Sequence, residues 1–173
     1  MSDCVAVSGF IARRPVDADF AVLAQMRRDS RLQNMLLSVP ERTDDDAVRE
    51  WIARRSSAPG GLFRVIAETD GAAVGFIQIS RVDEPPKAYG GIALAEGYRG
   101  RGVGAVALSA LLMIAREELG LISLLAEIRT DNPSSIRLHE RFGYRRVGVM
   151  DEHFLGTDGQ RHDVLLMQRR FED

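Results

Sequence analysis

A glycine-rich stretch between a β-like run and a long apolar run constrains this chain more than any other feature. Residues 98–104 read YRGRGVG, with glycines at three alternate positions and an arginine before each of the first two. The preceding run, 88–94, favours a strand, whereas 103–119 repeats apolar residues at helical spacing. Such a loop presents backbone N–H groups and the positive end of a helix dipole to an anion. The sequence therefore predicts a phosphate-binding turn at 99–104.

Strand-like and helix-like runs alternate along the rest of the chain. Strands are predicted at 10–13, 62–68, 73–81, 123–128, 144–149 and 164–170, and further helices at about 17–28, 43–55 and 133–142. Asp70-Gly71 is a strong hairpin signal, whereas the helix between two β-like runs implies a parallel crossover. We expect a single α/β domain over 1–173, with a mixed, mostly antiparallel sheet of about seven strands and about four helices.

Composition narrows the class of protein. The 173 residues are enough to bury a core without disulfides, and 45% hydrophobic with 28% charged residues is ordinary for a globular protein. A net charge of -2 gives no reason to expect nucleic acid or a membrane as partner. The lone cysteine, Cys4, fits a reducing compartment, and no signal peptide or membrane span is evident. We expect a cytoplasmic protein with no metal site.

The glycine loop can be compared with three known phosphate-binding motifs. The Walker pattern GxxxxGK followed by serine or threonine is absent. A dinucleotide fingerprint is matched loosely by Gly102-Val-Gly104-Ala-Val-Ala107, with Glu127 at the end of the next strand. Against it, residues 95–101 separate the glycines from the strand, and the chain shows one parallel crossover instead of a repeated series. The dinucleotide-binding domain is therefore the less favoured alternative.

The third motif is the pyrophosphate-binding loop of a known superfamily. Arg99-Gly-Arg-Gly102-Val-Gly104 resembles the Q/R-x-x-G-x-G/A signature of the GNAT superfamily of N-acetyltransferases. EIRTDNPSSIRLHERFGYRRVG resembles the fifth strand, following helix and sixth strand of that superfamily. The ending HFLGTDGQRHDVLLMQRRF looks like the last hairpin of the branch with ribosomal-protein N-terminal and polyamine acetyltransferases. The resemblance implies a GNAT fold whose fourth and fifth strands splay apart.

The resemblance also implies acetyl-CoA as co-substrate and a set of residues that bind it. The loop amides would hold the pyrophosphate, backbone groups of the fourth strand would hold the pantetheine arm, and an asparagine would begin the next helix. In this sequence the corresponding residues are Gly91, Ile92, Ala93, Leu94, Arg99, Gly100, Arg101, Gly102, Val103, Gly104 and Asn132. Asn132 also suits a helix cap before Pro133, and the two roles are compatible.

Two residues are candidates for proton transfer. His139 stands in LHERFG where the family often has the tyrosine that donates a proton to the coenzyme A sulfur. It is either that acid or a packing residue on the helix. Glu127 matches a glutamate that serves as base in some N-terminal acetyltransferases, although many members carry an acid there without that role.

The expected function is direct acetyl transfer from acetyl-CoA to a primary amine, without an acyl-enzyme, because Cys4 is remote from the motifs. The acceptor is a small-molecule amine such as a polyamine or amino sugar, or a protein N-terminus, and a homodimer is possible. Residues 30–42 correspond to the segment that covers the acceptor cleft in the family. The alternative is a catalytically weak acyl-CoA-binding regulatory module.

Overall fold

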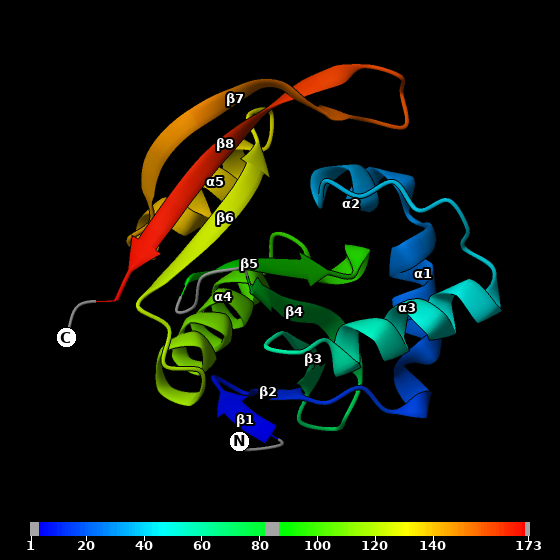
Figure 1. Ribbon diagram of the computed structural model, residues 1–173. Helices are drawn as coiled ribbons and strands as arrows, with labels where there is room; N and C mark the ends of the chain where they lie inside the picture. The colour runs from blue at the N-terminus through cyan, green and yellow to red at the C-terminus, as the bar shows by residue number, and fades with distance from the viewer. Residues whose placement is uncertain (1–3, 82–86, 172–173) are drawn as a thin grey trace.

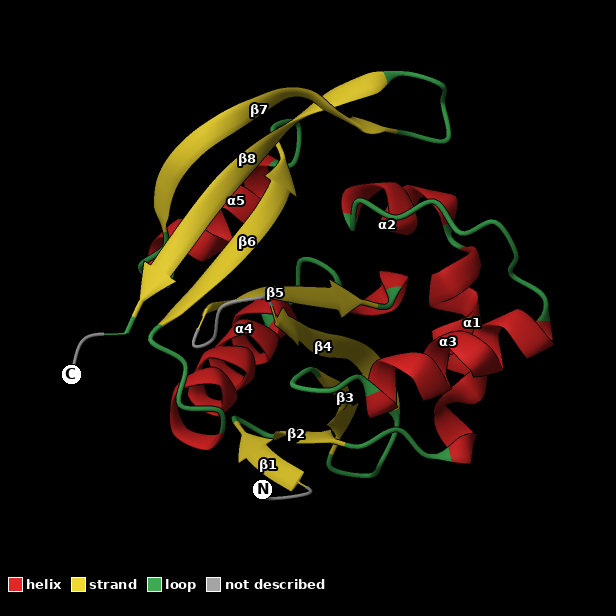
Figure 2. Cartoon of the chain, viewed as in Figure 1, coloured by secondary structure: helices red, strands yellow, loops and turns green. Residues whose placement is uncertain are grey.

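The computed structural model describes residues 4–81 and 87–171, in which eight strands form one sheet in the order β1-β2-β3-β4-β5-β6-β8-β7 (Figure 1). The strands are β1 (Cys4–Val7), β2 (Phe10–Arg13), β3 (Leu62–Glu68), β4 (Ala73–Arg81), β5 (Lys87–Leu94), β6 (Ser123–Arg129), β7 (Arg145–Leu155) and β8 (Arg161–Arg170). The helices are α1 (Phe20–Arg28), α2 (Ser30–Met35), α3 (Asp45–Ser57), α4 (Val103–Met113) and α5 (Pro133–Arg141), and α4 continues into a π-helical turn over Ile114–Glu118 (Figure 2).

The predicted mixed sheet is confirmed, with two additional elements. β1 is an extra strand, because the chain reverses at Ser8 and Gly9, both with positive φ, and pairs with β2. α2 forms in a segment without clear periodicity, where the Asp29 carboxylate accepts a hydrogen bond from the Leu32 N–H at 3.0 Å. α3 begins after Asp44, whose carboxylate accepts a hydrogen bond from the Ala47 N–H at 3.1 Å.

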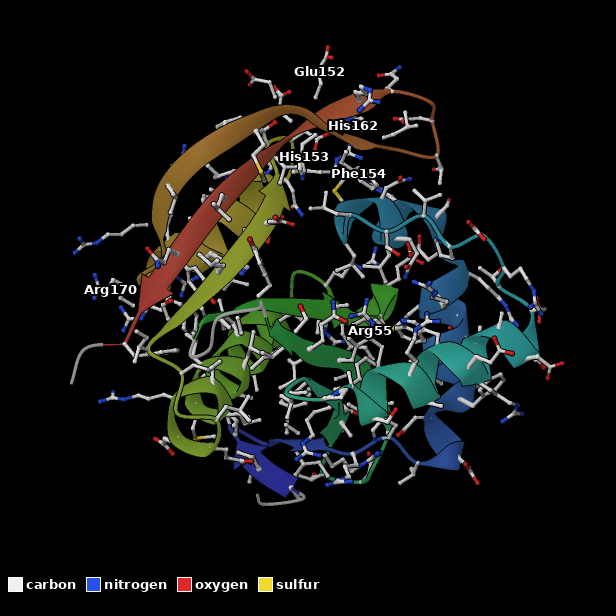
Figure 3. All side chains as sticks on the ribbon, viewed as in Figure 1. Arg55, Glu152, His153, Phe154, His162 and Arg170 are labelled. Atoms are coloured by element: carbon white, nitrogen blue, oxygen red, sulfur yellow. The ribbon has the colours of Figure 1, made fainter. Side chains whose placement is uncertain are left out.

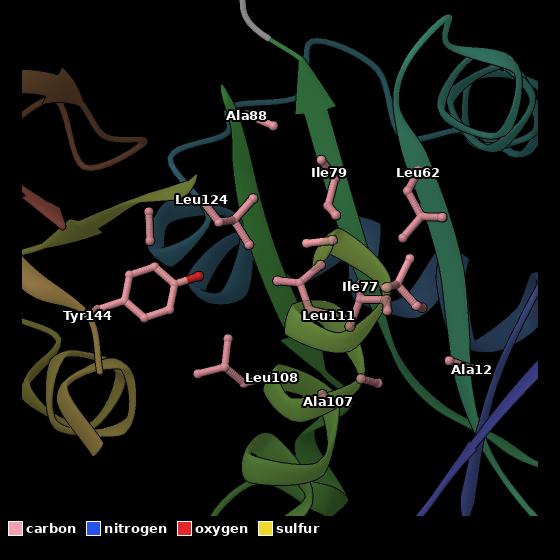
Figure 4. Close-up of a cluster of buried hydrophobic side chains, with 14 of the residues drawn as sticks. Ala12, Leu62, Ile77, Ile79, Ala88, Ala107, Leu108, Leu111, Leu124 and Tyr144 are labelled. Atoms are coloured by element: carbon pink, nitrogen blue, oxygen red, sulfur yellow. The ribbon is translucent and has the colours of Figure 1, made fainter. Parts of the chain in front are cut away.

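Helices cover both faces of the sheet and bury two apolar clusters. On one face α1 and α3 pack on β3 and β4, where Trp51 contacts Phe63 and Phe76 edge-on with ring centroids 5.4 and 5.7 Å apart. On the other face α4 and α5 bury a second cluster, part of which Figure 4 shows between Leu111 of α4 and the strands. Among the described residues, no helix is both long and apolar enough to cross a bilayer.

The sheet opens between its two parallel strands. β5 pairs with β6 over Lys87–Tyr89 and Ser123–Leu125, whereas the rest of each strand pairs with its outer neighbour, β4 or β8. The other described strand pairs are antiparallel, so the sheet lacks the repeated parallel crossovers of a dinucleotide-binding fold. The predicted splay of the fourth and fifth strands thus appears here as the gap between β5 and β6.

Candidate active site

The glycine loop lies between the end of β5 and the start of α4. Gly100 and Gly102 have φ values of 74° and 84°, which other residues adopt only with strain, and no atom lies within 4 Å of where a Cβ would stand. Gly102 is the N-cap of α4, whose first N–H groups have no partner within the helix. The N–H groups of Arg99 and Ala105 are bonded to the Glu96 and Gly102 carbonyls, so the donors that this turn can offer to an anion are those of residues 100–104.

Gly104 has a different reason for being glycine. A Cβ at this position would lie 3.3 Å from Leu138 Cδ2, so the missing side chain allows α4 to approach α5 closely. A larger residue at 104 would disturb this packing as well as the loop.

The two loop arginines are already engaged within the protein. Arg99 donates hydrogen bonds from Nε to the Leu94 carbonyl at 3.2 Å and from Nη2 to Asp29 at 3.0 Å. Arg101 donates to the Gly97 carbonyl at 3.2 Å, with its guanidinium 5.7 Å from the centre of the Tyr98 ring. Although burial opposes the shift, hydrogen bonds from Leu32 N–H and Arg99 hold the pKa of Asp29 below its usual value. Arg99 therefore ties the glycine loop to α2.

The register of β5 determines which of its backbone groups face the opening. The Ala95 N–H donates to the Val74 carbonyl on the β4 side at 2.9 Å. Because backbone groups alternate in direction along an antiparallel strand, Ala93 and Gly91 also bond toward β4. Gly90, Ile92 and Leu94 then direct theirs toward the gap. Of the four predicted pantetheine contacts, Ile92 and Leu94 face the gap through their backbone. At Gly91, on the α1 and α3 side, a Cβ would be in ordinary contact with the Gln78 side chain, 3.5 Å from its Nε2.

Glu127 is the β6 residue that the register, extended beyond the last β5–β6 pair, brings level with Gly91. Tyr89 and Leu125 are partners in the parallel register, so advancing each strand by two residues brings Gly91 and Glu127 level. Both positions lie on the face covered by α1 and α3, since Ala93 packs in that cluster and Ala126 packs in the opposite one. Glu127 is exposed although Ala126 and Ile128 beside it are buried. Its side chain is therefore accessible to solvent on this face of β6.

Asn132 and His139 lie on α5, behind the opening. Asn132 is the N-cap of α5, and its Oδ1 accepts a hydrogen bond from the Ser135 N–H at 3.2 Å. His139 is 4% exposed, and its Nδ1 lies 2.8 Å from the Ser135 carbonyl, so this nitrogen carries the proton. The imidazole meets the Tyr144 ring edge-on at 4.8 Å. Burial lowers the pKa of His139, which favours the neutral ring with Nε2 as an acceptor.

The β7–β8 hairpin also borders the site, because it reaches over β5 to α2 (Figure 1). Asn34 of α2 and Thr157 in the hairpin turn are hydrogen-bonded to each other. Within the hairpin, His162 Nε2 lies 3.0 Å from the Asp158 carboxylate, and Figure 3 shows Phe154 and His162 near this end. Sequence reasoning placed 30–42 at the acceptor side but not its partner, because the contact joins residues 123 positions apart.

Comparison with known proteins assigns the family. Residues 10–145 match the model of the acetyltransferase (GNAT) domain. The chain is 35% identical over 106 residues to an uncharacterized Mycobacterium leprae protein, ML0378, covering 60% of this chain and 28% of that protein. It is 36% identical over 91 residues to the N-alpha-acetyltransferase RimI of Mycobacterium tuberculosis, covering 51% of this chain and 55% of RimI. The chain thus spans about half or less of the length of these relatives.

Solved structures agree on the fold. Spermidine N-acetyltransferase from Vibrio cholerae, determined with CoA and spermine, superposes with a TM-score of 0.85 at 16% identity, over 94% of this chain and 95% of that one. The matched segment 10–145 contains the glycine loop, the opening and all of α5. The chain belongs to the GNAT family of acetyltransferases.

Proposed function

We propose that this protein transfers an acetyl group from acetyl-CoA directly to a primary amine. The observation that carries the proposal is the junction of two features at one end of β5. The strand opens away from β6 over Gly90 to Leu94, and the chain then runs into the glycine loop at the N-terminus of α4. The two features together provide a continuous path for an extended molecule with a phosphate-bearing end.

Acetyl-CoA is the co-substrate of this family, and the described residues fit it. The open space beside Gly100 and Gly102 leaves the loop amides accessible to a pyrophosphate. Backbone groups of Ile92 and Leu94 face the gap where the pantetheine arm would lie, and Asn132 keeps its side-chain amide N–H₂ while capping α5. Bound there, acetyl-CoA supplies the acetyl group as a thioester.

Glu127 is proposed as the general base. An alkylamine has a pKa of about 10.4, so at neutral pH it must lose a proton before it can act as a nucleophile. The exposed carboxylate opposite Gly91 is placed to accept that proton, directly or through a water molecule. Donors on β5, such as the N–H of Ile92, would polarise the thioester carbonyl.

For His139 the geometry supports packing over the acid role. Proton donation from Nε2 requires the imidazolium, which burial disfavours, because Nδ1 already uses its proton on the Ser135 carbonyl. We propose that His139 shapes the wall of the site together with Tyr144. Cys4 is exposed on β1, at the far edge of the sheet, which fits transfer without an acyl-enzyme.

The class of acceptor stays open at this stage. RimI is named for the N-alpha-amine of proteins, and the Vibrio structure for spermidine. An amino sugar also remains among the candidates. A cytoplasmic location and a homodimer stay predictions.

The test is thiol release from acetyl-CoA with N-terminal peptides, polyamines, amino sugars and amino acids. Glu127→Gln should lower kcat by about 10²-fold or more, the usual contribution of general base catalysis. Its dissociation constant for acetyl-CoA should not change. Glu117→Gln, an exposed glutamate on the π-helical turn, is the matched control and should keep full activity.

Two outcomes would contradict the proposal. Full activity of the Glu127→Gln variant would exclude this residue as the base. Binding of acetyl-CoA without turnover of any acceptor would favour the alternative, an acyl-CoA-binding regulatory module.

A further inference from the structure

Three arginines of α1 and α3 take part in none of the ion pairs of the described residues. Three arginines around α1 and α3 are in ion pairs: Arg13 with Asp19, Arg28 with Asp45 and Arg42 with Asp44. By contrast, no carboxylate in the described part of the chain forms an ion pair with Arg27 of α1 or with Arg54 and Arg55 of α3. We call these three residues the arginine cluster.

Arg27 is held rigidly at the centre of the cluster. Its guanidinium lies 5.1 Å from the centre of the Trp51 ring, a cation–π distance. Nη1 donates hydrogen bonds to Gln33 Oε1 at 2.8 Å and to Ser38 Oγ at 3.1 Å, both neutral acceptors. The charge of Arg27 is therefore fixed in place without being neutralised.

Arg55 approaches Arg27 from α3. It follows Trp51 by one helical turn, so the two residues share the face that packs toward α1 and the sheet. In Figure 3 Arg55 projects from the C-terminal part of α3 on the side of β5 and α2. Burial first, then the charges of Arg55 and Arg54, lower the pKa of Arg27, as expected for cations gathered without a counter-ion.

The register relates the arginine cluster to the proposed active site. Trp51 contacts Phe63 on β3, Phe63 is paired with Gln78 on β4, and Gln78 is paired with Gly91 on β5. Two strand spacings, about 10 Å, separate Phe63 from Gly91. All of these residues lie on the face covered by α1 and α3, where Glu127 borders the opening. The cluster and Glu127 thus lie on opposite sides of Gly91.

We infer that the amine acceptor carries an anionic group, a carboxylate or phosphate, which binds the arginine cluster while the amine lies beside Glu127. This inference rests on the proposed function and names its substrate class. Arginine binds such oxyanions through charge-assisted, often bidentate hydrogen bonds. A polyamine would bring further positive charge toward three unpaired cations, and like charges repel at this range. An acidic N-terminal peptide and an acidic amino acid both have the required chemistry.

The experiment compares acceptors that differ only in charge. The peptide Ala-Asp-Glu-Phe is tested against Ala-Asn-Gln-Phe, free aspartate against free asparagine, and spermidine serves as the cationic reference. We expect kcat/KM to be at least 10-fold higher for the acidic member of at least one pair. The pair that shows this difference tells whether the acceptor is a peptide N-terminus or a free amino acid. Arg55→Gln should remove most of that preference. Arg49→Gln is the control, because it deletes the same charge from α3 at a residue that stacks on Phe20 instead.

A binding measurement keeps the inference testable without turnover. The N-acetylated forms of both peptides are titrated calorimetrically into CoA-saturated wild-type, Arg55→Gln and Arg49→Gln protein. The acidic peptide should bind wild type and Arg49→Gln alike and Arg55→Gln at least 5-fold more weakly. If no acceptor reacts but this pattern appears, the anion-binding role of the arginine cluster stands and the proposed transfer fails. A preference for spermidine, or equal binding of both peptides, overturns the inference while leaving amine acetylation intact.

Discussion

Asn34 of α2 and Thr157 of the β7–β8 turn bind each other through two hydrogen bonds. Asn34 Nδ2 donates to Thr157 Oγ1 at 2.6 Å, and the Thr157 N–H donates to Asn34 Oδ1 at 3.0 Å. The side-chain amide of Asn34 thus both donates a hydrogen bond to Thr157 and accepts one from it. The hairpin is thereby fastened to the helix that follows α1, on the side of the sheet where the acceptor is proposed to bind (Figure 1).

Asn34→Ala removes both bonds and should loosen the hairpin. Because each bond is solvent-exposed and contributes about 1 kcal/mol at most, we expect the KM of the acceptor to rise about fivefold. The dissociation constant of acetyl-CoA should stay constant, since the glycine loop is untouched. Steady-state kinetics and amide hydrogen exchange of 156–160 measure both effects. Thr157→Ser keeps both bonds and is the control; an equal rise in KM for this variant would contradict the explanation.

Gly102→Ala should weaken acetyl-CoA binding. The left-handed backbone at this position costs a residue with a Cβ about 1–2 kcal/mol, so the loop would relax away from the conformation that exposes its amides. We expect the dissociation constant, measured by calorimetry, to rise at least 10-fold. Gly97→Ala is the matched control, because a Cβ there meets no atom within 4 Å and its φ is not positive. Similar affinities for the two variants would remove Gly102 from the binding loop.

Asp29→Asn should change how the free energy of unfolding depends on pH. Asparagine caps a helix about as well as aspartate, so the exchange isolates the charge that pairs with Arg99. The pKa of Asp29 is lowered in the folded state, so its contribution is present above the unfolded value near 4 and is lost as pH falls through the folded value. Thermal melting between pH 2 and 6 should show wild type losing more stability than the variant. Parallel curves would show that the ion pair is neutral in its effect.

His139→Phe should make the protein less sensitive to mild acid. Burial lowers the pKa of His139, so the unfolded chain takes up a proton near pH 6.5 that the folded protein resists. Stability from this residue is therefore present above that pH and declines as pH falls toward the lower folded value. Phenylalanine keeps the edge-on contact with Tyr144 and has no such titration. Melting temperatures from pH 5 to 7.5 should fall less steeply for the variant.

The same variant separates the two roles of His139. As a packing residue, its replacement by phenylalanine should leave kcat within about threefold of wild type, well below the factor of 10² or more that an essential acid contributes. A larger loss of kcat, with a changed acid limb of the pH–rate profile, would restore the acid role.

The local elements of this fold follow from the sequence alone. Residues 62–68 and 73–81 are strands as predicted, since their β-like composition and the Asp70-Gly71 turn act over short range. The glycine loop can likewise be predicted from the sequence, because positive φ at Gly100 and Gly102 and the start of α4 are local properties. β1 and α2 were missed because each depends on a turn or cap at one residue, Gly9 or Asp29, without a periodic pattern.

Tertiary structure alone decided which of these residues face one another. Whether Glu127 borders an opening depends on where β5 stops pairing with β6, and whether Arg27 is paired depends on α3 and α2 packing around it. The burial that lowers the pKa of His139 comes from neighbours such as Tyr144, and the bond between Asn34 and Thr157 spans most of the chain. Sequence patterns report the conformation of neighbours along the chain. Charge, burial and access at a site are set by neighbours in space.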